Sequence, residues 1–91
     1  MKTFVAIVET VPDYVERREA YRPAHRERLL KMKEEGKLMM GGAWADPVDG
    51  ALLIFRAESL AEVQRMIEED PYHQHGLWPA VRIREWNVAI Q

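Results

Sequence analysis

Three histidines are the residues of this sequence best suited to acid–base chemistry, because the unperturbed pKa of histidine lies close to neutrality. They are His25, His73 and His75. Counted in steps of three and four, His25 shares an apolar helical stripe with Tyr21, Leu29 and Met32. Such a stripe faces a protein core, so burial favours the neutral ring of His25 unless an anionic neighbour holds the proton.

A carboxylate is the natural partner for a histidine in this position. An aspartate that accepts a hydrogen bond from one ring nitrogen fixes the tautomer and leaves the other nitrogen free. That nitrogen is a general base able to take a proton from a phenol or a carbon acid. The alternative is a core histidine bonded to a backbone carbonyl, with the aspartate doing no more than capping a turn. The residues by themselves leave both interpretations open.

The other candidate residues have weaker patterns. His73 and His75 have a spacing that can supply two metal ligands, but no cysteine or second cluster completes a site, so a solvated loop is expected and no metal. Aromatic residues such as Trp44 could stack on a ligand or lie in the core. Phosphate-binding glycine loops and a serine nucleophile motif are missing, so no cofactor is expected.

Composition points to one domain over residues 1–91. With 47% hydrophobic and 31% charged residues the chain has the composition of a globular protein. A net charge of -2 with interspersed signs gives no basic stripe, which argues against nucleic acid as a partner. No cysteine is present, and the apolar run near the start is too short for a signal sequence or membrane span. We therefore expect a cytoplasmic protein that does not enter membranes.

The elements that must position His25 are expected at seven places. Strands are predicted at 3–9, 38–44, 51–56 and 80–88, and helices at 14–21, 23–35 and 60–69, with a loop from 70 through 76. Pro23 suits a first helical turn and Gly36 a helix end. Ser59 and Glu62 match a capping box, and Asp49-Gly50 is a hairpin signal.

The order strand, helix, strand, strand, helix, strand predicts an α+β fold. It is the ferredoxin-like βαββαβ motif, with a four-stranded antiparallel sheet and both main helices on one face. Strands 3–9 and 51–56 are apolar at consecutive positions, so each should be buried on both faces. Because the helices cover one face only, we expect a homodimer joined through the open face.

Several short motifs occur in a fixed order along nearly the whole chain. They are Arg22-Pro23-Ala24-His25, the run from Glu35 to Gly42, Asp49-Gly50-Ala51, Ser59-Leu60, and Asp70-Pro71-Tyr72 followed by Gly76-Leu77. As an ordered set they resemble the YciI-like family, whose YCII-related domain belongs to the dimeric α+β barrel superfamily. The resemblance implies a dimer of two packed sheets with a cleft between helices and sheet in each subunit. It also implies that His25 and Asp70 form a polar pair in that cleft.

The resemblance also bears on activity, because one relative in the wider family is a dehydrochlorinase acting on a chlorinated hydroxyhydroquinone. It implies a possible cofactor-independent lyase or isomerase in which His25 is the base and Asp70 orients it, acting on a small anionic or aromatic compound. The expected substrate contacts are Arg22, Tyr72, Gly42 and Trp44. Gly42 stands where many relatives have proline. Two alternatives remain: a non-catalytic module that binds a small molecule, and an accessory dimer whose cleft admits nothing.

Overall fold

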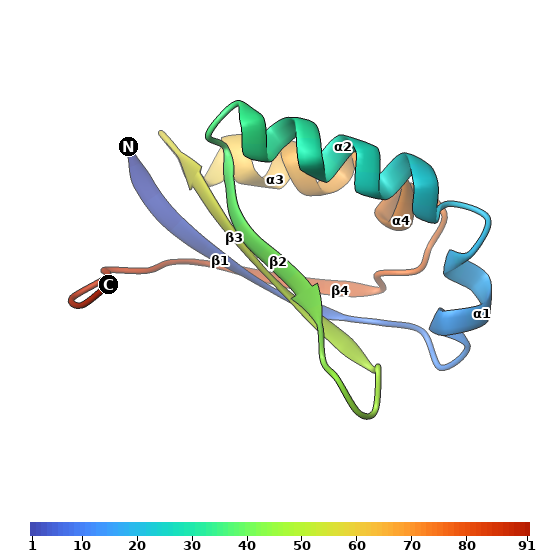
Figure 1. Ribbon diagram of the computed structural model, residues 1–91. Coiled ribbons are helices and arrows are strands. Elements are labelled where there is room, and N and C mark those ends of the chain that lie inside the picture. The colour runs from blue at the N-terminus through green and yellow to red at the C-terminus, as the bar shows by residue number, and fades with distance from the viewer.

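The computed structural model describes residues 1–91 and has four strands and four helices (Figure 1). The strands are β1 (Lys2–Glu9), β2 (Leu38–Ala43), β3 (Gly50–Ala57) and β4 (Ala80–Glu85). The helices are α1 (Tyr14–Arg18), α2 (Arg22–Glu34), α3 (Leu60–Glu68) and α4 (Pro71–Gln74). None of these helices is both long enough and apolar enough to cross a lipid bilayer.

The four strands form one sheet in the order β2-β3-β1-β4, and every neighbouring pair is antiparallel. Figure 1 shows α2 and α3 together on one face of this sheet, while α1 lies beyond the end at which β1 finishes. This arrangement is the ferredoxin-like α+β fold, so the predicted fold class is confirmed.

The core lies between the sheet and the helices. In β1 and β3 every second residue is buried on the helix side, and these residues pair across the strands: Phe4 with Phe55, and Ala6 with Leu53. The residues between them, such as Val5 and Ile7, are only half-buried. The sequence predicted burial of these strands on both faces. In the structure the helices cover a single face of the sheet, so the other face is open to solvent (Figure 1).

Helix α2, which carries the central histidine, starts and stops where the sequence predicted to within a residue. Pro23 lies in its first turn, where a missing amide costs no hydrogen bond. At its other end Gly36 has φ +77, and the N–H of Lys37 donates to the carbonyl of Met32. This is the glycine-terminated helix end that the lysine-rich last turn indicated.

The structure differs most from the predicted elements at four places. Helix α1 ends at Arg18 rather than at 21, β4 ends at Glu85 rather than at 88, and Gly50 is the first residue of β3 rather than part of a tight turn. The β2–β3 connection instead spans residues 44–49, closed by the Trp44 N–H donating to the Gly50 carbonyl. The expected loop after α3 contains the short helix α4.

Candidate active site

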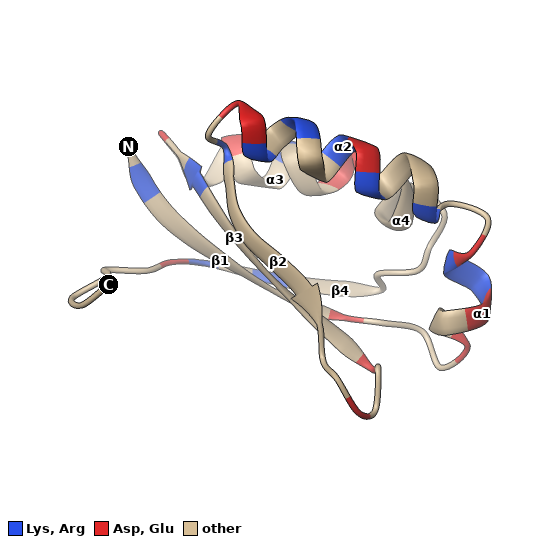
Figure 2. Ribbon diagram, viewed as in Figure 1, with Lys and Arg blue, Asp and Glu red and all other residues tan.

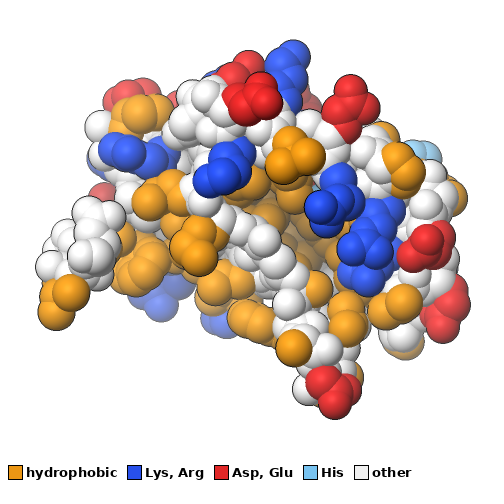
Figure 3. All heavy atoms as spheres, in the orientation of Figure 1, with side chains coloured by type: hydrophobic (Ala, Val, Ile, Leu, Met, Phe, Trp, Pro, Cys, Tyr) orange, Lys and Arg blue, Asp and Glu red, His pale blue; other side chains and the backbone are white.

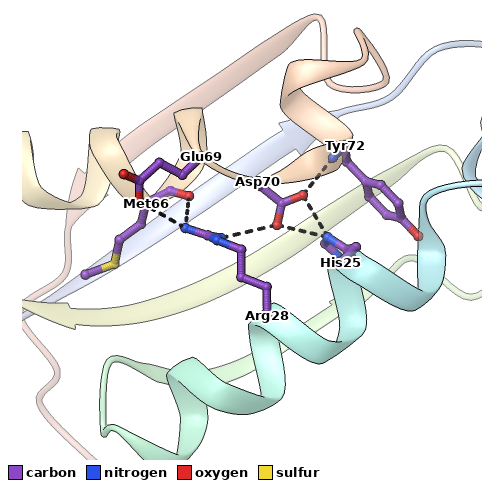
Figure 4. Close-up of polar contacts among 6 residues, drawn as sticks. All are labelled: His25, Arg28, Met66, Glu69, Asp70 and Tyr72. Carbon is purple, nitrogen blue, oxygen red and sulfur yellow. Dashed lines mark hydrogen bonds and ion pairs between the residues drawn. The ribbon is translucent and has the colours of Figure 1, made fainter.

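The centre of the site is a hydrogen-bonded pair formed by His25 of α2 and Asp70, which lies between α3 and α4 (Figure 4). Nδ1 of His25 is 2.8 Å from Oδ1 and 2.9 Å from Oδ2 of Asp70. Both residues are buried, with 9% of His25 and 1% of Asp70 exposed. The expected contact between these two residues, which lie far apart in the sequence, is therefore confirmed.

Asp70 is held in place by the start of α4. Its side chain caps that helix, accepting a 2.8 Å hydrogen bond from the backbone N–H of Tyr72. Pro71 follows at the first helical position, where its fixed φ suits a helix start. The Asp-Pro-Tyr sequence that ends α3 thus also begins α4, and its cap aims the carboxylate at His25.

Arg28 was not identified from the sequence, yet it lies beside the pair. Its guanidinium is 3.5 Å from Oδ2 of Asp70 and donates a 2.8 Å hydrogen bond to the carbonyl of Met66 (Figure 4). Arg28 also lies 3.6 Å from Glu69. The sequence did contain a signal for Arg28: it follows His25 by three residues, and residues at this spacing share a face of a helix. Arg28 balances the buried charge of Asp70 from the side opposite the histidine.

Aromatic rings surround the imidazole of His25. Tyr72 stacks on it with ring centroids 3.7 Å apart and planes 9° apart, and Trp78 meets it edge-on at 5.6 Å. Tyr14 meets Tyr72 edge-on at 5.8 Å. Burial is the main cause that raises the pKa of Tyr72 to about 12, and the nearby Tyr14 adds to it. Tyr72 therefore keeps its proton at neutral pH.

A cleft of about 310 Å³ opens between α1, α2 and the sheet. Its lining includes His25 and all four residues expected as substrate contacts, namely Arg22, Tyr72, Gly42 and Trp44. Asp70 is behind the histidine and does not line the cleft. This volume is at the lower end of the range of small-molecule sites and accommodates a single-ring metabolite.

Two further arginines, Arg18 and Arg26, line the same cleft, and neither was identified from the sequence. With Arg22 they are spaced four residues apart, a regular interval that was visible in the sequence, although α1 ends between the first and the second. Figure 2 shows the basic positions of α1 and α2, and Figure 3 shows basic side chains gathered at the edge of a hollow with an apolar floor. No acidic residue lines the cleft.

The arrangement leaves one ring nitrogen of His25 available. Because the carboxylate of Asp70 can only accept a hydrogen bond, Nδ1 carries the proton and Nδ1–H donates a hydrogen bond to Asp70. Nε2 takes part in no hydrogen bond, and the ring lines the cleft. The site can therefore present a nitrogen lone pair to a molecule in the cleft.

The other two histidines lie apart from this pair. The ring of His75 stacks on Tyr21 with centroids 3.9 Å apart, and His73 borders a separate surface depression beside α3 and β4. The structure contains no group of three or more metal-ligating side chains.

Comparison with known proteins gives a consistent set of relatives. The YCII-related domain family matches residues 2–87. The proteins called YciI from Escherichia coli O6:H1 and Shigella flexneri are each 30% identical to this chain, over 96% of it and 98% of their own length.

The solved structures that share the fold include the following two. One is the 5-chloro-2-hydroxyhydroquinone dehydrochlorinase TftG of Burkholderia phenoliruptrix AC1100, in complex with 2,5-dihydroxybenzoquinone. Its TM-score is 0.82 at 27% identity, with 93% of each chain covered. The other is a putative antibiotic biosynthesis monooxygenase from Nitrosomonas europaea, with a TM-score of 0.63 at 12% identity over 99% of this chain and all of the other. At that identity the second likeness shows the fold alone.

Proposed function

The chain belongs to the YCII-related domain family, and from this membership and its cleft we propose that it is a cofactor-independent lyase or isomerase acting on a small anionic or aromatic compound. The observation that carries the proposal is the difference in hydrogen bonding between the two ring nitrogens of His25. Its Nδ1 is bound to buried Asp70 at 2.8 Å, while Nε2 is unbonded in a residue that lines the cleft. A histidine oriented in this way is a general base.

The proposed reaction starts from a proton on a phenol oxygen or on a carbon next to a carbonyl group. Nε2 of His25 takes the proton, the electron pair stays on the substrate, and Asp70 stabilises the imidazolium that forms. In an isomerisation the ring returns the proton to another substrate atom. In an elimination the electron pair expels an anionic leaving group, and the proton passes to water.

The cleft surroundings support an aromatic substrate. Trp44 and Tyr72 offer rings and Gly42 lies on the wall, while the Tyr72 hydroxyl keeps its proton and can donate a hydrogen bond. Arg22 would bind an anionic group of the substrate. TftG, the structural relative with 27% identity, is a dehydrochlorinase whose structure contains a dihydroxybenzoquinone. Elimination from a hydroxylated ring is thus a suitable first reaction to test.

The active assembly that we propose is a homodimer joined through the open face of the sheet. Val5, Ile7, Leu52 and Ile54 lie on that face half-exposed, and they form the floor of a shallow apolar depression beside Trp86. Burying such a face in a second copy removes apolar surface from water.

A turnover experiment tests the base assignment. The protein would be incubated with halogenated and hydroxylated benzenes in deuterated water, with halide release and ring deuteration followed by NMR. Replacing His25 by Asn should lower any turnover by roughly 10² to 10⁴-fold, because the Asn amide can still donate to Asp70 but is no base. His73→Asn, outside the cleft, serves as the control.

The alternatives give different results in the same experiment. If compounds bind to the cleft but show neither deuterium exchange nor chemical change, the result would favour the non-catalytic binding module. Turnover that survives His25→Asn unchanged would remove His25 as the base.

A further inference from the structure

The cleft has hydrogen-bond donors in excess of acceptors, and the excess is concentrated on three arginines. Arg18, Arg22 and Arg26 line it, and none of them forms an ion pair with an acidic residue within 4.0 Å. The protein as a whole has a net charge of -2, so the charge of this cluster is opposite in sign to the net charge. Three unpaired guanidinium groups around one cleft create a local attraction for anions.

Two of these arginines are partly buried without a counter-charge. Arg18 and Arg22 are half-buried, and Nε of Arg18 is shielded from solvent with no hydrogen-bond acceptor. The Arg18 guanidinium also lies 5.2 Å from the ring centre of Tyr14, which holds it on the cleft side of α1. Partly burying a guanidinium group without a counter-charge is unfavourable, and an oxyanion bound in the cleft would supply the counter-charge that no acidic side chain provides.

A second unused donor lies at the histidine end of the cleft. The indole N–H of Trp78 has no acceptor, although Trp78 is only 4% exposed, and its ring lies edge-on against His25. This N–H is shielded from solvent, so the donors that the cleft presents to a ligand are those of the arginines.

Helix α2 adds to the positive potential near Arg22. Its N-terminus has no side-chain cap and no acidic residue in the first turn, so the partial positive charge of the helix end is not neutralised. Helix α3, in contrast, has Ser59 as its cap and Glu62 in its first turn.

We propose that the substrate carries a permanent oxyanion, of the carboxylate class, which Arg18, Arg22 and Arg26 bind while a separate phenol or carbon acid of the same molecule lies at His25. This inference rests on the proposed function for the identity of the reacting group. It assigns Arg18 and Arg26 as specificity-determining residues and narrows the substrate class to hydroxylated aromatic carboxylates or compounds of the same charge and shape. A neutral phenol lacks the group that the arginines bind.

A matched pair of ligands tests the inference through binding alone. Gentisate and hydroquinone share the dihydroxybenzene ring, and gentisate adds one carboxylate. Titrations followed by the side-chain N–H signals in NMR should show gentisate binding at least about tenfold more tightly than hydroquinone, since charge-assisted hydrogen bonds are the strong ones. Gentisate, and inorganic sulfate more weakly, should shift the Arg18 Nε–H signal.

Arginine variants identify the residues responsible. Arg18→Gln and Arg26→Gln should each weaken gentisate binding by about tenfold and change hydroquinone binding by no more than about twofold. Arg65→Gln removes the same charge from an exposed position on α3 outside the cleft and should change neither. If Arg18→Gln destabilises the fold by losing its contact with Tyr14, the test relies on Arg26→Gln, because Arg26 is exposed.

Three results would overturn the inference: equal affinity for the two ligands, arginine variants that behave like Arg65→Gln, or no signal shift with either gentisate or sulfate. The His25→Asn variant separates this inference from the proposed function. It should keep the gentisate preference and its dependence on arginine whether or not His25 is a base. Turnover that survives in that variant would therefore refute His25 as the base without contradicting the anion site.

Discussion

The two ring nitrogens of His25 have different surroundings and therefore different roles. Nδ1 is bound to a carboxylate that is 1% exposed, whereas Nε2 is unbonded in a residue lining the cleft. Burial and availability for chemistry therefore coexist in one side chain. A structural role for Nδ1 does not argue against a chemical role for Nε2, and loss of stability in a variant says nothing about the base.

Substitutions that keep or remove the Nδ1 donor should separate these effects. His25→Ala leaves Asp70 with only the Tyr72 N–H and Arg28, and opens a void under Tyr72, so unfolding free energy should fall by roughly 2 to 4 kcal/mol. His25→Asn can still donate to Asp70, and the loss should be closer to about 1 kcal/mol. Urea unfolding measures both, and equal losses would mean that the hydrogen bond to Asp70 contributes little.

Tyr72 should make the protein sensitive to alkaline pH. Burial raises its pKa from about 10 to about 12, so the folded protein keeps the phenol proton that the unfolded chain loses. The resulting stability is fully present below pH about 10 and is lost as pH rises through about 12. Unfolding free energy should thus fall more steeply over this range in the parent than in Tyr72→Phe. Parallel curves for the two proteins would contradict the shift.

The sequence led to some residues of the site and not to others, for physical reasons. Helical periodicity placed His25 on the buried face, and that interpretation is confirmed. Its pairing with Asp70 spans 45 positions, and no local pattern contains such a contact, so only the family resemblance supplied it. Arg28 was missed because it looked like one charge among many on α2, and its bonds are to residues of α3 and Asp70.

Among the secondary-structure elements, the residues that begin and end the two main helices were predicted correctly from the sequence. Gly36 ends α2, and the side chain of Ser59 accepts from the N–H of Glu62 at the start of α3, both as expected. Helix α4 was missed because four residues are too few for any periodicity to show. Its N-cap is Asp70, so the element that escaped prediction is also the one that positions the proposed orienter.

Two adjacent glycines of β2 should respond differently to the same substitution. A Cβ on Gly41 would lie 2.5 Å from Cδ2 of Leu53, a residue only 2% exposed, whereas a Cβ on Gly42 would meet nothing within 4 Å. Because Leu53 is packed in the core, Gly41→Ala should cost about 1 to 2 kcal/mol of unfolding free energy. Gly42→Ala should stay within about 0.5 kcal/mol. Thermal unfolding of both variants measures this, and equal effects would contradict the close approach.

For the whole molecule, the open sheet face raises the question of assembly. Its central residues are apolar and only half-buried in one subunit, although β1 and β3 are the middle strands of the sheet. Arg82 and Arg84 flank them on β4, so the face has an apolar centre with a charged margin along β4. Interfaces between subunits are commonly arranged in this way, and a chain of this length gains proportionally more from covering such a face than a larger one.

A charge placed at the centre of that face should abolish the proposed dimer without unfolding the subunit. Ile7 and Leu52 are register partners on β1 and β3, and both are half-exposed, so Leu52→Glu adds a carboxylate that remains solvated in the monomer and becomes buried in the dimer. Sedimentation equilibrium should give a dimer for the parent, with an interface above about 1,000 Å² in total, and a monomer for Leu52→Glu. Leu30→Glu makes the same change at an exposed position of α2 and should stay dimeric. A parent that is monomeric at micromolar concentration, or a Leu52→Glu variant that associates as tightly as Leu30→Glu, would show that this face is not the interface.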